Sequence, residues 1–289
     1  MPHIVCAGLI TVDFTFEIPG YPVEGTKMRA EGARMVAGGG ALIAASAVAA
    51  LGGQASLAGA VGDDALGAFL RDTFAARGIG DELVQVVPGV GTAHSAVLIS
   101  AGGERTIINH RDAALFPEVL TLAGPFGFDA ALADTRWPAG AAALLHGARA
   151  AGKPAVLDAE APVRLAQEAL HLASHIVFSQ QGLRDYAGAD DAATLAAVAQ
   201  ETGAFVAVTR GAAPVLCHEG GATFEVATFP ARAVDTLGAG DVWHGAFTLA
   251  LARGQAARDA VRHANAAAAA KVALPAGVLP GPDDLIAMA

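Results

Sequence analysis

Residues 154–209 contain three short apolar runs, PAVLD (154–158), HIVFS (175–179) and FVAVT (205–209), with alanine-rich helical stretches between them. Each run is almost continuously apolar, which is typical of strands that are buried on both faces of a sheet. Strands that alternate with helices usually pair in parallel and have helices covering both faces. This stretch therefore predicts an α/β fold, a three-layer α/β/α sandwich with a mainly parallel central sheet.

The same alternation extends over the rest of the chain. Further apolar runs are HIVCAGLI (3–10), ASLAGAV (55–61) and DAALAD (129–134). The chain has 289 residues, of which 54% are hydrophobic and 16% charged, so it can bury a substantial core. We therefore expect a single domain over residues 1–289, and we expect the AAAAA run at 266–270 to lie in a buried helix.

Two regions, residues 12–36 and 93–111, break this alternation. They contain strand-like segments without a helix between them, namely DFTFEI (13–18), HSAVLIS (94–100) and GERTIIN (103–109). The Gly102–Gly103 pair between two of these segments predicts a hairpin. We expect a small β-sheet inserted into the core as a lid over an active site. Its exposed edges predict that two lids pair in a homodimer.

The composition also limits partners and location. A formal net charge of −10 argues against nucleic acid or an anionic membrane as a partner, so an anionic substrate would need a local basic pocket. Cys6 and Cys217 are far apart in apolar runs, which predicts neither a disulfide nor a metal site and favours the reducing cytoplasm. The N-terminal residues lack a signal-peptide pattern, and charge or glycine interrupts the alanine-rich helices, so we expect neither export nor a membrane span.

The segment DTLGAGDVWHGAF at 235–247 carries the clearest chemical signal. One carboxylate, Asp241, follows its small residues and lies at the start of a predicted helix. Backbone N–H groups of small residues can approach an anion closely, and a helix N-terminus adds partial positive charge. The segment can therefore hold a transferring phosphoryl group beside a base. The structural alternative is an ordinary strand–turn–helix junction with a capping aspartate.

A second glycine-rich segment, VAGGGALIAASAVAALGG, spans residues 36–53. Its three glycines precede an alanine- and leucine-rich helix, and by themselves they could serve only tight helix–sheet packing. The chain has no GxxxxGK[ST] motif and no GxGxxG after its first strand. A P-loop kinase and a Rossmann dehydrogenase are therefore disfavoured.

Together, DTLGAGD (235–241), VAGGG (36–40) and VGDD (61–64) with Gly67 resemble the signatures of the ribokinase-like, or PfkB, carbohydrate kinase family. The resemblance runs from residue 3 to residue 285 and implies ATP-dependent transfer of a phosphoryl group to a sugar hydroxyl. It implies that Asp241 is the catalytic base and that the amides of Gly238, Ala239 and Gly240 form the anion hole. The sugar-site residues that it implies are Asp13, Gly38, Gly39 and Gly40.

For ATP, the resemblance implies contacts from TRG (209–211) and from HANAAAA (263–269), which is expected to open the penultimate helix. The ATP-binding residues would be Thr209, Gly211, Gly238, Gly240 and Asn265. The position of Asp13 also favours a role in ligand binding, because Asp13 follows the first predicted strand, at the edge where open α/β sheets bind ligands. The alternative for Asp13 is an aspartate in a surface turn.

Four segments, GTK (25–27), GERTIIN (103–109), LADTRW (132–137) and VFSQQGL (177–183), resemble the 6-deoxy-6-sulfofructose kinases within this family. In that branch, a Lys, an Asn and an Arg side chain bind the sulfonate. The resemblance therefore implies that Lys27, Asn109 and Arg136 are the substrate-binding residues for this anion here. These donors suit an anion with three acceptor oxygens. Ribokinases have Lys and Asn where this chain has Gly40 and Ile43, which disfavours ribose.

Several alternatives stay open at the level of sequence. Arg136 could pair with Asp134 or Asp158, and Lys27 could simply be solvated. The sugar could instead be 2-keto-3-deoxygluconate, fructose or a phosphorylated hexose. The remotest alternative is a non-catalytic sugar- or nucleotide-binding regulator, which would have little need for an intact base and anion hole.

The expected cofactors follow from the same resemblance. Members of the family carry an NxxE motif near the metal and phosphates, whereas the corresponding stretch here is SQQG (179–182), which lacks the Glu. Mg²⁺ is still expected to neutralise charge on ATP, held chiefly by phosphates and water. The resemblance also admits a monovalent cation, K⁺, near Asp235 and Thr236, although nothing else in the sequence requires one.

Overall fold

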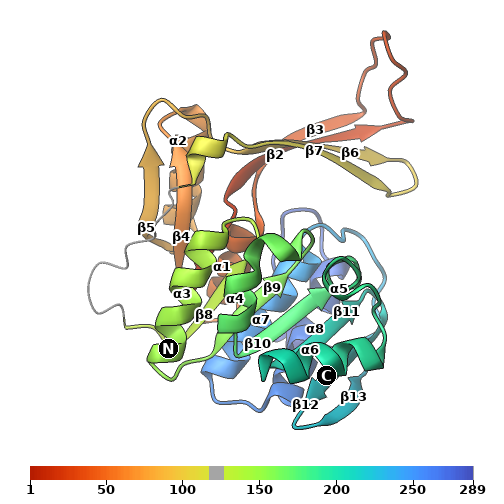
Figure 1. The fold of residues 1–289 in the computed structure, drawn as a ribbon. Coiled ribbons are helices and arrows are strands. Elements are labelled where there is room, and N and C mark those ends of the chain that lie inside the picture. The colour runs from red at the N-terminus through yellow and green to blue at the C-terminus, as the bar shows by residue number, and fades with distance from the viewer. Residues whose placement is uncertain (117–126, 289) are drawn as a thin grey trace.

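The computed structural model describes residues 1–116 and 127–288, and its largest element is a nine-stranded sheet (Figure 1). The sheet order is β13-β12-β11-β10-β9-β8-β1-β4-β5, and all neighbours pair in parallel except β11 with β12 and β12 with β13. The strands are β1 (His3–Ala7), β4 (Gln54–Gly62), β5 (Gly80–Val87), β8 (Ala130–Asp134), β9 (Ala155–Ala159), β10 (His175–Ser179), β11 (Phe205–Arg210), β12 (Ala213–Glu219) and β13 (Ala222–Val226). The expected mainly parallel sheet is confirmed.

Helices cover both faces of this sheet (Figure 1). One layer contains α1 (Gly40–Ala50), α2 (Ala65–Ala76), α7 (Ala239–Ala252), α8 (Ala257–Ala273) and α9 (Pro282–Ile286). The other contains α3 (Pro138–Ala150), α4 (Gln167–Leu172), α5 (Gln180–Ala187) and α6 (Ala192–Thr202), with the 3₁₀ turn η2 (Val163–Ala166) nearby. A second 3₁₀ turn, η1 (Ala113–Leu115), packs against β4. In β1, Ile4 and Cys6 pack into the first layer, whereas Val5 and Ala7 pack into the second. Burial on both faces explains why the strands are almost continuously apolar.

A separate four-stranded sheet, in the order β3-β2-β6-β7, extends over the core (Figure 1). Its strands are β2 (Thr11–Ile18), β3 (Gly32–Gly38), β6 (His94–Ser100) and β7 (Arg105–His110), so it arises from the two regions that break the core pattern. The predicted hairpin joins β6 to β7: Gly103 has a φ of +81°, and its N–H donates to the Ser100 carbonyl at 2.8 Å. We refer to these four strands and the loop 19–31 as the lid sheet.

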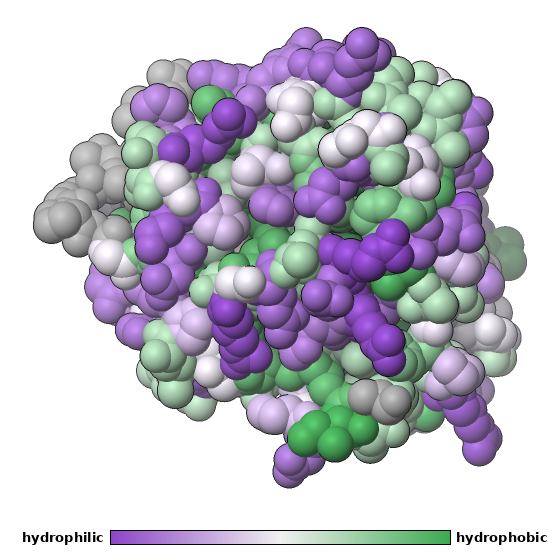
Figure 2. Space-filling view, turned by 90° about the horizontal axis from the view of Figure 1, so that it is seen from below, coloured by the Kyte–Doolittle hydropathy of each residue, from purple (hydrophilic) through white to green (hydrophobic). Residues whose placement is uncertain are grey.

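Two further expectations concern burial and surface. The 266–270 alanine run lies within α8 and is largely buried, as expected. Cys6 and Cys217 are both free and buried, and burial raises the pKa of each thiol to about 12. Hydrophilic residues cover much of the face seen in Figure 2. Within residues 1–116 and 127–288, every helix is too short or too polar to cross a membrane.

Candidate active site

Asp241 stands in the first turn of α7, directly after the glycine-rich segment. Gly238 precedes the helix in the left-handed region, with a φ of +75°, and Ala239 and Gly240 form its first two residues. The first N–H groups of a helix have no partner within it, and they lie at the positive end of the helix dipole. Of these groups, the Ala239 N–H makes only a long bond of 3.3 Å, to the Thr236 carbonyl. The structure thus brings the predicted anion-hole residues together beside the predicted base.

Asp241 has an environment that favours its protonated form. Burial raises its pKa to about 7, and the negative charge of Asp158 reinforces the rise, whereas His244 opposes it. The negative charges of Glu160 and Asp134 raise the pKa of Asp241 by smaller amounts. A carboxylate that titrates near neutral pH is well matched to accepting a proton from a hydroxyl.

His244, which sequence reasoning did not single out, lies on the next turn of α7. Its Nδ1 donates to the Gly240 carbonyl at 2.8 Å and lies 3.4 Å from Asp158 Oδ2. The side chain is buried, and this burial lowers the pKa of the imidazole. His244 therefore links the first turn of α7 to β9. The helical spacing of three residues from Asp241 is the signal that could have identified it.

The three glycines at 38–40 allow close approach to the site carboxylates. A Cβ on Gly38 would lie 2.1 Å from Asp13 Oδ2, and one on Gly40 would lie 3.1 Å from Asp241 Oδ1. Gly39 has a φ of +94°, and a Cβ there would lie 2.2 Å from the Leu9 carbonyl oxygen. The turn therefore serves more than helix–sheet packing, because it has Asp13 at one end and Asp241 at the other.

Asp13 lies within β2 and is 9% exposed, so it is not the surface-turn aspartate of the alternative interpretation. Burial raises its pKa, although a hydrogen bond with Ser95 opposes the rise. Asp13 pairs with Ser95, which pairs with Asn109 on the neighbouring strand. Because paired residues share one face of a sheet, Asn109 lies on the same face of the lid sheet as Asp13.

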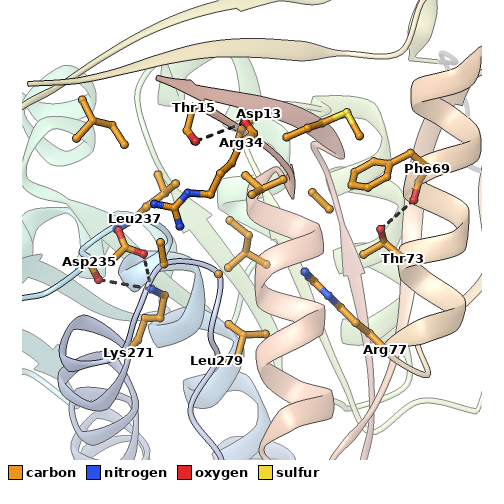
Figure 3. A pocket seen from close by; sticks show the side chains of 17 residues that line it. Asp13, Thr15, Arg34, Phe69, Thr73, Arg77, Asp235, Leu237, Lys271 and Leu279 are labelled. Carbon is orange, nitrogen blue, oxygen red and sulfur yellow. Dashed lines mark hydrogen bonds and ion pairs between the residues drawn. The ribbon is translucent and has the colours of Figure 1, made fainter. Parts of the chain in front are cut away.

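A cavity of about 300 Å³ opens between the lid sheet, α1, α2 and the segments 235–237 and 276–279 (Figure 3). Asp13, Arg34 and Arg77 line it. Arg34 extends from β3 toward the centre of the view, and Arg77 reaches in from the end of α2 (Figure 3). Burial lowers the pKa of Arg77, whose Nη1 donates to Ser46 Oγ at 2.7 Å. The cavity lining therefore combines basic side chains with Asp13 and Asp235, and Arg34 itself pairs with Glu17 Oε1 at 2.6 Å.

The lid sheet also contacts the glycine-rich segment itself. Arg105, the first residue of β7, donates from its guanidinium to Thr236 Oγ1. Ile99, the register partner of Arg105 on β6, lines the same cavity as Asp235 and Leu237. The face of the lid sheet that carries Asp13 therefore lies over the segment that leads to Asp241.

The three residues expected to grip an anion do not converge within one chain. Asn109 lies two residues before Arg111, whose guanidinium donates to the Arg136 carbonyl at 2.9 Å. Lys27 is exposed in the loop beyond β2, which points away from the core at the upper right of Figure 1. From Asp13 to the end of β2 at Ile18 is already roughly 17 Å at 3.3 Å per residue. The expectation of a single Lys–Asn–Arg site is therefore wrong for an isolated chain.

Arg136 also has a carboxylate partner that the sequence did not identify. Its Nη2 lies 2.5 Å from Glu160 Oε2, and its Nη1 donates to the Ala161 carbonyl at 2.7 Å. Asp134, which the alternative interpretation named, instead accepts the backbone N–H of Arg136 at 2.8 Å. The guanidinium is 29% exposed, so a substrate anion would have to compete with Glu160 for it.

The residues expected to bind ATP differ in their access. Thr209 is the penultimate residue of β11 and pairs with Ser179 of β10, and Gly211 is exposed in the following turn with a φ of +61°. Asn265 is 3% exposed in the interior of α8, which begins at Ala257, so the segment 263–269 does not open that helix.

The amide of Asn265 is occupied on both sides. Its Oδ1 accepts from Trp243 Nε1 at 2.7 Å, and its Nδ2 donates to the Ala227 carbonyl at 3.0 Å. A direct ATP contact from this side chain would require it to give up these partners. Any contribution of Asn265 to ATP binding is therefore indirect, through the chain at 226–227.

The SQQG stretch offers no carboxylate for Mg²⁺. Ser179 Oγ accepts the Gly182 N–H at 3.0 Å and caps α5, and Gln180 Nε2 donates to Asp190 Oδ2 at 2.8 Å. Within the described residues no three His, Cys, Asp or Glu side chains are grouped as a metal site. We therefore still expect Mg²⁺ to arrive with ATP, held by phosphate oxygens and water.

A carboxylate at a helix N-terminus, an adjoining set of amides and a buried aspartate in a separate sheet are features expected of a phosphotransferase that acts on a hydroxyl. Comparison with known proteins makes the class specific. The family model described as pfkB family carbohydrate kinase matches residues 1–282, and the chain belongs to this family. It is accordingly an ATP-dependent carbohydrate kinase.

Individual proteins and solved structures also match this chain over most of its length. A ribokinase from Haemophilus influenzae is 24% identical over 92% of this chain and 90% of its own length. An ATP-dependent ribose-1-phosphate kinase from Halopiger xanaduensis is 26% identical over 93% and 91%. Among solved structures, a candidate ribokinase from Agrobacterium tumefaciens matches with a TM-score of 0.93 and 35% identity, covering 99% of this chain and 96% of its own. Arabidopsis thaliana ribokinase, solved with ribose and ATP, shares the fold with a TM-score of 0.86 at 22% identity, covering 99% and 98%.

Proposed function

We propose that this kinase transfers the γ-phosphoryl group of ATP to a primary hydroxyl of a ketose-type monosaccharide. The observation that carries the proposal is Asp241, whose pKa of about 7 and place in the first turn of α7, beside Gly40, suit it to act as the base. The hydroxyl proton passes to the Asp241 carboxylate, the hydroxyl oxygen bonds to the γ-phosphorus, and the bond from that phosphorus to the β–γ bridging oxygen breaks to release ADP. Mg²⁺ bound with ATP supplies neutralisation of phosphate charge. The amides of residues 238–240 stabilise the charge that develops.

The proposed acceptor is an anionic sugar, with 6-deoxy-6-sulfofructose, phosphorylated to its 1-phosphate, as the first candidate. Asn109 and Arg136 support this choice, because Asn109 lies on the face of the lid sheet that carries Asp13, and Arg111, two residues further along the chain, donates to the Arg136 carbonyl. A relative named for ribose 1-phosphate makes a phosphorylated sugar the second candidate, since a phosphate and a sulfonate present similar oxygen acceptors to Arg. Fructose and 2-keto-3-deoxygluconate remain as comparison substrates.

The test compares kcat/KM for 6-deoxy-6-sulfofructose, fructose 6-phosphate, fructose and 2-keto-3-deoxygluconate by coupled ADP release. We expect an anionic sugar to be preferred, and Arg136→Ala to raise its KM by roughly thirtyfold or more, the equivalent of about 2 kcal/mol, without raising that of fructose. Arg71→Ala is the matched control, because Arg71 makes only an exposed pair with Asp81 at 3.7 Å. Equal use of fructose would reject the anionic acceptor, and no ADP release with any sugar would reject this acceptor class altogether.

We also propose a homodimer formed through the lid sheets. Met35 and Ile108 support it, because they are 44% and 62% exposed and lie in one cross-strand row, on the face of the lid sheet opposite Asp13. Burying such side chains against a second copy removes apolar area from water. Light scattering should give twice the chain mass of 28.8 kDa, and Ile108→Glu should shift the protein toward the monomer. A wild-type monomer at micromolar concentration would overturn this arrangement.

The proposed location is the cytoplasm. Two free, buried cysteines with raised thiol pKa values support it, since a reducing compartment keeps such thiols unpaired. Fractionation of the native host, with the protein followed by antibody, would check this assignment.

A further inference from the structure

Lys271 is a buried lysine in the last turn of α8. It is one of three lysines in the chain, and only 3% of it is exposed. Its Nζ donates to Asp235 Oδ2 at 2.8 Å and lies 3.5 Å from the Asp235 carbonyl oxygen (Figure 3). Lysines are almost never fully buried unless their charge is paired. The ammonium and the Asp235 carboxylate, which is 17% exposed, therefore neutralise each other.

This pair anchors the start of the segment that forms the anion hole. The other oxygen of Asp235, Oδ1, accepts the Leu237 N–H at 3.0 Å. The Val272 carbonyl, next to Lys271, accepts the backbone N–H groups of Val234 and Asp235 at 2.6 and 3.2 Å. The segment held in this way runs directly into Gly238, which precedes α7. Lys271 is thus a positioning residue for the amides beside Asp241.

A monovalent cation near Asp235 does not fit this arrangement. Such a cation would need oxygen ligands, and at Asp235 these are the carboxylate and carbonyl oxygens. The Lys271 ammonium already lies within reach of both. A second positive charge at the same oxygens would meet strong repulsion in a partly buried site.

We propose that Lys271 takes the place of an exchangeable monovalent cation at Asp235, so that activity does not depend on K⁺. The lowered pKa of Asp235 is consistent with this proposal. Burial alone would raise the pKa of Asp235, but the bond from Lys271, the Leu237 N–H and the charges of Lys271 and Arg105 outweigh it and hold the pKa below its ordinary value. The carboxylate is therefore ionised at neutral pH without any added cation.

The first test measures the wild-type enzyme in tetramethylammonium chloride and in KCl at equal ionic strength. We expect kcat and the melting temperature to differ by little between the two salts, less than about twofold for kcat, since the site already holds a full positive charge. Activation of the wild type by more than about fivefold in KCl would overturn the inference, because that effect exceeds ordinary ionic-strength differences.

The second test uses Lys271→Met, which leaves a buried carboxylate without its cation. In tetramethylammonium chloride we expect kcat to fall by roughly tenfold or more and the melting temperature to fall with it. KCl should restore part of both, because K⁺ can then enter at Asp235. Lys153→Met is the matched control, since Lys153 makes only an exposed pair with Asp129 at 3.6 Å. Wild-type kcat in the variant, or no response of either quantity to KCl, would contradict the inference.

If Lys271→Met fails to fold, the double variant Asp235→Asn with Lys271→Met removes both charges and leaves no unpaired ion. We expect this double variant to fold and to have a low kcat, with kcat and melting temperature unchanged by KCl. A strong response of either quantity to KCl would contradict the role assigned to Lys271. The activity measurements rest on the proposed function. The melting temperatures do not, so they still decide the role of Lys271 if no tested sugar is phosphorylated.

Discussion

Asp241→Asn is expected to lower kcat by about 10²–10⁴-fold, the usual share of a general base, while ATP binding stays nearly unchanged. Asparagine has almost the same shape as aspartate, so the first turn of α7 and its amides should keep their positions. The amide cannot accept the hydroxyl proton, however. Single-turnover ADP release measures the chemical step, and calorimetric titration with ATP measures binding. Near-normal turnover would remove Asp241 from the role of base.

The same variant is not expected to lose stability, because the pKa of Asp241 is raised from 3.8 to about 7 in the folded state. The folded protein therefore holds this proton more tightly than the unfolded chain does. The free energy of unfolding consequently falls as pH rises from about 4 to about 7, where Asp241 is forced to ionise. Asparagine avoids this ionisation, so the melting temperature at and above pH 7 should be equal or higher. A lower melting temperature would mean that lost activity reflects unfolding.

The wild-type pH profile provides an independent check on this base. Because Asp241 must be ionised to accept a proton, kcat/KM should fall by about tenfold per pH unit below its pKa and level off above it. The pKa of about 7 puts that change near neutral pH. The residual activity of Asp241→Asn should lack the inflection. If the variant retains it, the titrating group is another one, of which Asp158 and His244 are the nearest.

The sequence predicted the core strands because they are buried on both faces, and such strands leave a clear apolar pattern. Strands β5, β12 and β13 were not identified; β5 and β13 are the edge strands of the large sheet, and β12 is next to β13. Edge strands have a solvent-exposed side, so polar residues interrupt their apolar pattern, as in GDELVQVV (80–87) of β5 and ATFEV (222–226) of β13. The lid sheet was recognisable because it lacks helices between its strands.

At the site, local motifs predicted Asp241, Asp13 and the glycines, and the fold brings them together: Gly38 ends β3 beside Asp13, and Gly40 begins α1 beside Asp241. The contacts that the sequence did not predict are tertiary contacts between residues far apart in the chain. Lys271 is 36 residues from Asp235, and Glu160 is 24 from Arg136, so no spacing could reveal either pair. Lys27 was misplaced because a loop of unknown direction carries it. The resemblance implied that Asn265 contacts ATP, whereas its side chain accepts a hydrogen bond from Trp243 within the core.

Asp13→Ala is expected to lower kcat/KM for the sugar by about 10²–10⁴-fold and to leave the KM for ATP unchanged. The estimate assumes two hydroxyl hydrogen bonds to an ionised carboxylate, each worth about 1.5–3 kcal/mol. Asp13 lies at the glycine turn opposite Asp241, so it can hold the sugar against the base without touching the phosphates. Steady-state kinetics with each substrate varied in turn separates the two effects.

Stability again distinguishes binding from folding. Burial raises the pKa of Asp13, so its ionised form is disfavoured in the folded protein and the free energy of unfolding falls as pH rises above the ordinary pKa of the carboxyl group. Asp13→Ala should therefore melt no lower than the wild type at neutral pH. Asp81→Ala, which removes an exposed aspartate paired with Arg71, is the control and should change neither kinetics nor melting. An equal loss with both substrates would show that Asp13 supports the lid sheet rather than the sugar.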